Sequence, residues 1–177
     1  MNLTDSNSNL VFYYEIEKIY KRVVNRSLQR VRGLKDPSGR PLFDTLALTD
    51  SERNTFDHSI APKSAVKVFR FLQPFTKDVV SAYQYNADEP DSSNGESGYI
   101  IYTVDPPTNY DPNSTDPLDT QIEAALVACM LREWFTISGA PEFAFECATE
   151  YDDLTSEINS LLQRRTAATI RPYNIIG

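Results

Sequence analysis

The stretch that decides the fold is residues 116–165, which read DPLDTQIEAALVACMLREWFTISGAPEFAFECATEYDDLTSEINSLLQRR. It opens with Asp116 and Pro117, an N-cap residue followed by a proline at the first helical position. A helical pattern of apolar residues runs to Gly139, and a second one restarts at Pro141. Two helices of about 20 residues joined by so short a turn pack antiparallel, so this stretch predicts an αα-hairpin. The periodic positions are Ile122, Leu126, Cys129, Met130 and Ile137, then Phe143, Cys147, Tyr151, Leu154, Ile158, Leu161 and Arg165.

A basic helix is predicted near the start of the chain. Apolar residues recur at near-helical spacing from Phe12 to Val31, and Gly33 is a natural left-handed stop. Many of the intervening residues are cationic, which suits the negative C-terminal end of the helix dipole. The basic face of this helix comprises Lys18, Lys21, Arg22, Arg26 and Arg30.

A turn and two shorter helices are predicted next. Residues 36–39 read Asp-Pro-Ser-Gly, a turn sequence. Residues 49–52 offer N-cap residues for a short helix over 52–59. A further helix runs from about Pro62 and ends or kinks near Pro74. We expect its inward residues to be Val66, Phe69 and Leu72.

A small amount of β structure is predicted in the middle of the chain. Residues 99–104, YIIYTV, are rich in β-branched and aromatic side chains and indicate a strand. Residues 79–85 fit a helix or a strand; if 80–85 pair with 99–104, residues 88–98 are the loop of a long hairpin. Residues 106–117 have no period and predict a loop.

These elements predict a mainly α fold: a helical bundle with a long C-terminal αα-hairpin, a small β-hairpin insertion and an extended C-terminal arm. We expect one domain over residues 1–165, with the β-hairpin and an acidic loop inserted at about 79–116. Residues 166–177 follow the last helix, lack a helical pattern and predict the arm. A helical domain of this size folds without disulfides or metal.

No secretory leader or membrane segment is predicted. The start of the chain lacks a basic stretch followed by an apolar run, and no stretch approaches the roughly 18 apolar residues that cross a bilayer. Cys129 and Cys147 are the only cysteines, too few for a disulfide framework or a zinc site. We expect both as buried free thiols of a protein made in a reducing cytoplasm.

Charge is distributed unevenly along the chain. The net charge is −8, yet residues 1–77 hold 13 Lys and Arg against 8 Asp and Glu. Between Lys77 and Arg132 there is no basic residue, while ten carboxylates occur there. This region is either a solvated acidic loop or a surface suited to stacking or to lining a repulsive channel. Its candidate residues are Asp88, Glu89, Asp91 and Glu96.

Catalytic and cofactor-binding patterns are scarce, so we expect no enzyme and no cofactor. His58 is the only histidine and is expected to be a surface residue. No glycine-rich phosphate loop, zinc spacing or calcium loop is present in the sequence. A two-carboxylate hydrolase is the enzymatic alternative, with the acidic loop or Glu133 beside Trp134 as its acids; solvation and an ordinary helix-surface glutamate are the simpler interpretations.

The basic helix has two interpretations. Seven cations over residues 18–35 match the charge of several phosphates. Against nucleic-acid binding stand the net charge of −8 and the lack of aromatic residues interleaved for base stacking. We expect the cations to meet carboxylates instead, either of a neighbouring subunit or of the acidic half of the same chain.

Several short motifs together resemble a known family. Asp36 to Gly39 and Leu42-Phe43-Asp44 form a D-x-x-G turn followed by an L-[FY]-D motif, and Thr49-Asp50 caps a helix. An L-x-x-W-[FY] helix and a long helix ending in Arg-Arg follow, before an Arg-Pro-Tyr sequence; the residues are Leu131, Trp134, Phe135, Arg164, Arg165, Arg171, Pro172 and Tyr173. Over residues 10–173 the chain resembles the small neck proteins of tailed bacteriophages of Bacteroides-type hosts, including crAss-like phages. It is also similar in architecture to the adaptor or head-completion proteins that ring the portal.

The resemblance implies a structural subunit of a ring of about twelve copies in the neck of the virion. Its partners would be further copies of itself, the portal protein and adjacent neck or tail proteins. DNA would pass through the lumen without specific binding, and acidic lumen loops would repel its phosphates. The implied location is the virion, and the host cytoplasm during assembly, with no membrane contact. Another tail-completion or assembly protein is the alternative, and a small hydrolase is a further one.

The C-terminal arm is the predicted partner-binding segment. An apolar chain end suggests a covering partner, because chain ends are usually polar. The simpler interpretation is that the arm packs on its own domain as an edge strand beside residues 99–104. We expect it to dock on a neighbouring subunit instead, through Ile170, Arg171, Tyr173, Ile175 and Ile176.

Overall fold

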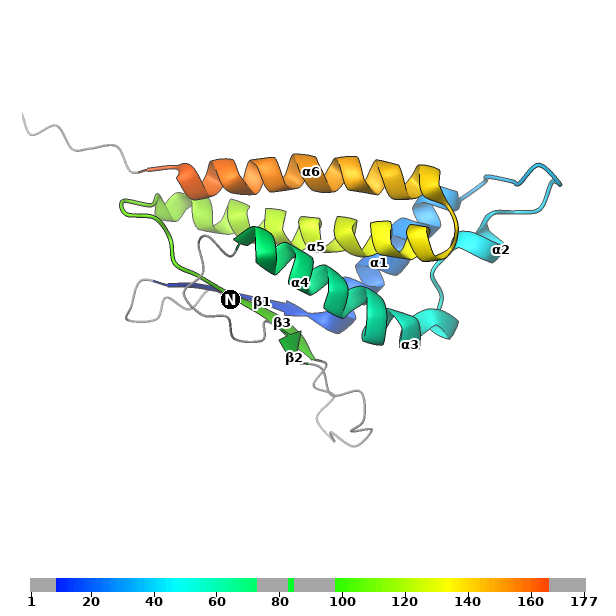
Figure 1. Ribbon diagram of the computed structural model, residues 1–177, viewed down its shortest axis with the longest axis horizontal. Helices are drawn as coiled ribbons and strands as arrows, with labels where there is room; N and C mark the ends of the chain where they lie inside the picture. Colours follow the sequence, from blue (N-terminus) through cyan, green and yellow to red (C-terminus); the bar gives the residue numbers. More distant parts are fainter. Residues whose placement is uncertain (1–8, 73–82, 85–97, 166–177) are drawn as a thin grey trace, which may run out of the picture.

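The computed structural model describes residues 9–72, 83–84 and 98–165 of the chain. The mainly α fold and the αα-hairpin predicted from the sequence are confirmed. α5 (Thr115–Ile137) and α6 (Pro141–Gln163) lie antiparallel along the long axis of the molecule (Figure 1). The short turn between them contains Gly139, whose φ of 73° favours glycine because a side chain is strained there.

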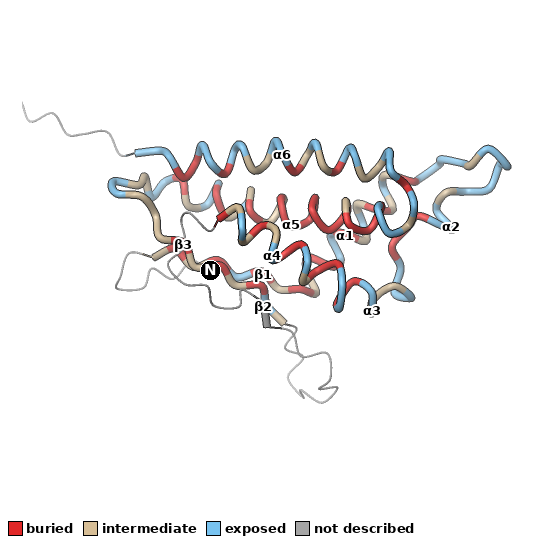
Figure 2. The backbone as a smooth tube through the Cα atoms, viewed as in Figure 1, coloured by how far each residue is buried: buried red, intermediate tan, exposed pale blue. Residues whose placement is uncertain are grey.

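α5 is the central helix of the molecule. Its buried residues extend from Leu118 to Phe135 and lie all around the helix, because α6, α4, α1 and β1 pack on it from different sides. In Figure 2, α5 is mostly buried, whereas α6 is buried only along the side that faces α5. The single apolar stripe predicted for α5 is therefore too narrow. Ile137, expected in that stripe, is 53% exposed at the end of the helix.

The N-terminal helix begins later than predicted. Leu10–Glu15 forms strand β1, and α1 spans Ile16–Val31. Phe12 and Ile16 are four residues apart, a spacing that fits both a strand and a helix, so the apolar pattern does not separate the two. Burial alternates along the strand, as it does where one face of a sheet is covered.

The three strands form one antiparallel sheet in the order β1-β3-β2. β1 pairs with β3 (Tyr99–Val104) residue for residue along its whole length. β2 (Tyr83–Gln84) pairs with the first two residues of β3, which confirms the predicted hairpin at those positions. The remainder of the predicted insertion up to residue 97 lies outside the described residues.

A continuous helical run replaces the two separate helices predicted over 52–59 and from Pro62. It comprises a 3-10 turn (Asp50–Glu52), α3 (Arg53–Thr55), a π-helical segment (Phe56–Ile60) and α4 (Ala61–Leu72). Pro62 has no amide hydrogen, and its ring crowds the carbonyl one turn earlier. The π turn, in which the Ala61 amide donates to the Phe56 carbonyl, widens the helix just before this proline.

The inward face of α4 differs from the predicted one. Val66 is 47% exposed and Phe69 only partly buried, whereas Leu72 is buried as predicted. The buried positions are Ala61, Ser64, Ala65, Val68 and Leu72. Small residues at this face let α4 approach α5 and the sheet closely, which a pattern of large apolar residues does not reveal.

The local signals at helix ends and turns are largely confirmed. Thr49 and Glu52 form a capping box before α3. Gly33 takes a φ of 77° just after α1, and the Gly39 amide donates to the Asp36 carbonyl in the predicted turn. A short helix, α2 (Phe43–Leu46), follows that turn.

The start of α5 is the exception among these signals. The helix begins at Thr115 rather than after an Asp116 cap, and a 3-10 turn (Pro112–Ser114) precedes it. Asp111 caps that turn, because its carboxylate accepts from the Asn113 amide at 3.0 Å.

Candidate interaction surfaces

The basic face of α1 points at carboxylates of the same chain. All five of its predicted residues form ion pairs. Two are within the N-terminal segment, and three reach α5 or α6. The pairs are Lys18–Glu15 (2.7 Å), Lys21–Glu17 (3.5 Å), Arg22–Glu123 (2.9 Å), Arg26–Glu150 (2.6 Å), Arg30–Glu146 (2.8 Å) and Arg30–Glu150 (2.9 Å).

These pairs join the basic helix to carboxylates of its own chain, one of the two partners expected for it. Arg26 and Arg30 share Glu150, so α1 is fastened to α6 across more than a hundred residues of sequence. Arginine guanidinium groups bind phosphate with two parallel hydrogen bonds, and those of Arg26 and Arg30 are already bonded to carboxylates. Of the two alternatives, the structure shows the intramolecular one, in which α1 neutralises part of the acidic half of its own fold.

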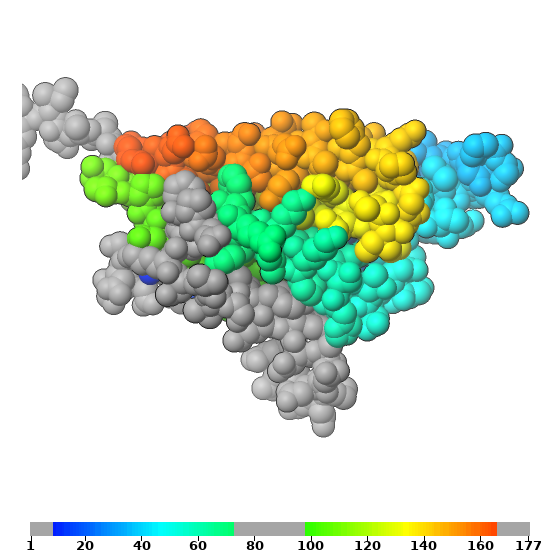
Figure 3. Space-filling view, viewed as in Figure 1, coloured from blue at the N-terminus to red at the C-terminus, as the bar shows by residue number. Residues whose placement is uncertain are grey.

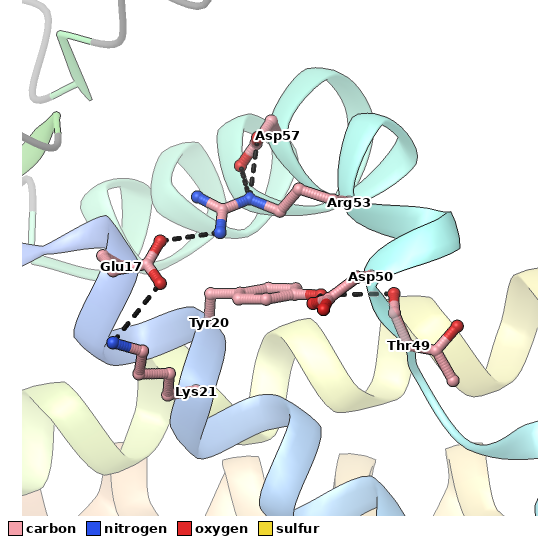
Figure 4. Close-up of polar contacts among 7 residues, drawn as sticks. All are labelled: Glu17, Tyr20, Lys21, Thr49, Asp50, Arg53 and Asp57. Carbon is pink, nitrogen blue, oxygen red and sulfur yellow. Dashed lines mark hydrogen bonds and ion pairs between the residues drawn. The ribbon is translucent and has the colours of Figure 1, made fainter.

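A second polar cluster centres on Arg53, which the sequence analysis does not single out (Figure 4). Its Nε donates to both oxygens of Asp57, at 2.9 and 2.8 Å, and its Nη1 donates to Glu17 at 2.7 Å. The guanidinium carbon lies 4.2 Å from the centre of the Tyr20 ring. Arg53 therefore joins α1 to the helical run of α3 and α4.

The electrostatics of this cluster favour its charged form. The hydrogen bond from Arg53 lowers the pKa of Glu17 below its ordinary value. Burial opposes the charge of Arg53, yet its bonds to Glu17 and Asp57 raise the pKa of Arg53 overall. Burial and a hydrogen bond to Asp50 raise the pKa of Tyr20 to about 12. The arrangement is an ion-pair network whose hydrogen bonds join α1 to α3 and to the π-helical segment.

The structure describes two of the candidate catalytic residues, His58 and Glu133. His58 is exposed, as expected, and the neighbouring Asp57 is held by Arg53. Glu133 forms an ion pair with Lys63, and the Trp134 Nε1 donates to the Leu46 carbonyl at 2.8 Å. Glu133 and Trp134 thus both take part in the packing between α5 and the segments around it.

The two thiols are free and buried, as predicted. Burial raises the pKa of both, that of Cys147 to about 11, so both thiols stay protonated at neutral pH. Among the described residues, no group of three His, Cys, Asp or Glu side chains is arranged to hold a metal ion. None of the described helices is long and apolar enough to span a membrane.

The surface with the most exposed large apolar side chain in the described part of the chain lies where α5 meets α6. Phe145, on the first turns of α6, is 74% exposed, more than any other large apolar side chain in the described part of the chain. Beside it is a groove of about 400 Å³, here called the hairpin groove. Its walls include Arg132, Thr136, Pro141, Ala144, Phe145 and Ala148. An exposed aromatic beside an apolar hollow is typical of a surface that another molecule covers.

The outer side of α6 is acidic. The helix contains no Lys, Arg or His between Pro141 and Gln163, and it forms an outer layer of the molecule in Figure 3. Glu146 and Glu150 are paired with α1. Within the described residues no cation lies within ion-pair distance of the other four carboxylates, which we call the α6 acidic face: Glu142, Asp152, Asp153 and Glu157.

Two predicted sites lie outside the described residues. They are the acidic loop, with Asp88, Glu89, Asp91 and Glu96, and the arm, with Ile170, Arg171, Tyr173, Ile175 and Ile176. The described chain leads toward the arm through Arg165, which forms an isolated antiparallel bridge with Tyr110. Along β3, the whole of one edge is paired with β1, so the edge-strand position considered for the arm is limited to the other side.

The chain was compared with known proteins at three levels. No family model, no curated protein and no solved structure matches it.

Proposed function

We propose that this chain is a structural subunit of an oligomeric ring in the neck of a tailed phage virion, where it links the portal to the tail and lines the DNA channel. The observation that carries the proposal is the exposed Phe145 beside the hairpin groove. A large aromatic side chain gains on the order of 1.5–3 kcal/mol when it is moved from water into an apolar contact. A surface of this kind is expected on a subunit that packs against others.

The rest of the described chain supports a structural role. The ion pairs of α1 join it to α6, and Arg53 joins α1 to α3, so these elements pack as one unit around the αα-hairpin. Of the acidic candidates for catalysis, Glu133 is bonded to a cation, and the residues of the predicted acidic loop lie outside the described residues. In a ring, that loop would face the channel, where its carboxylates repel DNA phosphates and let the genome slide.

The phage neck as the location rests on the sequence motifs given above, and the interaction surface is what the structure adds to them. The same surface also suits another tail-completion or assembly protein. Electron microscopy separates the two roles, since a neck subunit forms a closed ring around the channel.

The test is the mass and shape of the purified full chain. Mass photometry over a range of concentrations should show a species of about twelve chains, and negative-stain images should show rings with a central opening. Particles containing the protein should carry it between portal and tail. A chain that stays monomeric at every concentration, and is absent from purified particles, overturns the proposal.

A further inference from the structure

The hairpin groove and the α6 acidic face lie along one side of the same helix. Phe145, Thr149 and Asp152 follow each other at spacings of four and three, so they form one row on the exposed side of α6. The row is apolar at Phe145, where the groove opens, and it carries Glu142 one turn before Phe145 and Asp152 two turns after it. A matching ligand is a segment that carries apolar side chains at one end and cations at the other.

Residues 164–177 of this chain have that composition. They contain Arg164, Arg165 and Arg171 and no carboxylate side chain, followed by Tyr173, Ile175 and Ile176. We infer that the hairpin groove of one copy receives Ile175 of a neighbouring copy, while Arg171, on the same face of that extended segment, meets Asp152 or Asp153. The inference deepens the proposed function and rests on it, because it names the contact that joins neighbouring subunits in the ring.

The spacing of the two partners agrees. Arg171 and Ile175 are four residues apart, which is about 13 Å in an extended segment. Phe145 and Asp152 are seven residues apart on a helix, which is about 10 Å along its axis. An extended segment lying along α6 therefore places Ile175 at Phe145 and brings Arg171, on the same face of the segment, within side-chain reach of Asp152.

A neighbouring copy fits this surface better than the chain's own arm. The described chain leaves α6 at its far end, about 27 Å along the axis from Phe145. To return, the ten residues from Arg165 to Ile175, which span at most about 33–36 Å, would have to reverse direction and run almost fully extended. An arm from another copy meets no such restriction.

The test uses two full-length variants that disable opposite sides of the contact. Phe145→Asp removes the groove side and keeps the arm, and the double variant Ile175→Asp/Ile176→Asp removes the arm side and keeps the groove. Phe145 is exposed, so its variant should keep the helix content and melting temperature of the wild type. Each variant alone should assemble at least about tenfold more weakly than the wild type. Val66→Asp is the matched control, because Val66 is an exposed apolar residue on α4, and it should assemble normally.

Mixing the two variants tells a neighbour's arm from the chain's own. An intact arm then meets an intact groove only between unlike chains, and the complex cannot grow further, so mass photometry should show a dimer. A charge exchange gives an independent reading: Asp152→Lys/Asp153→Lys should weaken assembly, and adding Arg171→Asp should restore it.

The outcomes separate this contact from the proposed ring. If wild type and both variants form the same rings, the ring stands and the contact is wrong; a mixture that stays monomeric likewise rejects docking between copies. If the wild type itself is monomeric, the proposed ring is wrong. The contact is then tested by measuring the binding of a labelled peptide of residues 166–177 by fluorescence anisotropy. That peptide should bind the arm variant and not the Phe145→Asp chain, and equal or absent binding overturns the inference.

Discussion

Arg53 shows how a single side chain holds distant elements of this molecule together. It bonds to Asp57 on its own helical run and to Glu17 on α1, and it stacks on Tyr20. Asp57 is only 5% exposed, and its carboxylate accepts two hydrogen bonds from Arg53. Removing one side of a buried pair leaves the other charge without compensation.

Arg53→Met should therefore lower the free energy of unfolding by about 2–4 kcal/mol, since it leaves the Asp57 carboxylate buried without its guanidinium. Urea unfolding followed by circular dichroism measures the loss. Lys21→Met is the control, because Lys21 contacts the same Glu17 from a largely exposed position, and it should cost less than about 0.5 kcal/mol. Equal losses in the two variants would show that the network has no special role.

The same network predicts how stability depends on pH. The pKa of Glu17 is lower in the folded chain than its ordinary value of 4.5, because Arg53 donates to the ionised carboxylate. The stabilisation is complete above pH 4.5 and is lost as the pH falls through the lower folded value. Glu17→Gln should make the free energy of unfolding less sensitive to pH below 4.5, as measured by urea titrations at several pH values. Parallel curves for variant and wild type would contradict this.

At the scale of elements, the αα-hairpin is the core onto which the other parts pack. α5 is covered on most sides, whereas α6 has one buried and one exposed side. The two helices therefore differ in how strongly a core substitution should act. Leu126 on α5 is fully buried, and Leu154 on α6 is only partly buried against the core.

Leu126→Ala should cost about 2–5 kcal/mol of unfolding free energy, because it leaves a cavity in the central helix. Leu154→Ala should cost less, about 1–2 kcal/mol, since solvent or neighbouring side chains partly fill the space. Chemical denaturation of both variants measures the difference. A larger loss at Leu154 would mean that α6, not α5, is the central helix.

At the scale of the whole molecule, stability and assembly are carried by different surfaces. The core, the α1 ion pairs and the Arg53 network hold one chain together, while Phe145, the hairpin groove and the α6 acidic face remain exposed. A change confined to the arm should then affect association without affecting the fold.

Deleting residues 168–177 should leave helix content and the melting temperature of the monomer nearly unchanged, and it should abolish assembly. Circular dichroism and mass photometry on the same preparation measure both. Assembly of the full chain should also weaken as salt is raised from about 0.05 to 0.5 M, because exposed arginine–carboxylate pairs are screened. A truncated chain that unfolds, or that assembles like the wild type, contradicts the assignment of the arm to the interface.

The features that depend on neighbouring residues could be predicted from the sequence. Pro141 after Gly139 marks the hairpin turn, Thr49 with Glu52 marks the capping box, and Gly33 marks the end of α1. Each signal acts through backbone conformation or a hydrogen bond within a few residues, so it can be read without knowing the rest of the fold. Mainly helical class and the αα-hairpin follow from such signals together with the apolar period.

The features that depend on residues far apart in the chain could not be predicted from the sequence and follow from the packed fold. Phe12 fits a helix and a strand equally, and β1 exists because β3 pairs with it about ninety residues later. Arg30 is one of several basic residues in the sequence, and its role in joining α1 to α6 depends on its ion pair with Glu150. Phe145 lies outside the predicted apolar period of α6, and its exposure follows from the packing, because no other part of the described chain covers it. Burial and pairing are properties of the packed molecule, since they depend on which surfaces meet after the local elements have formed.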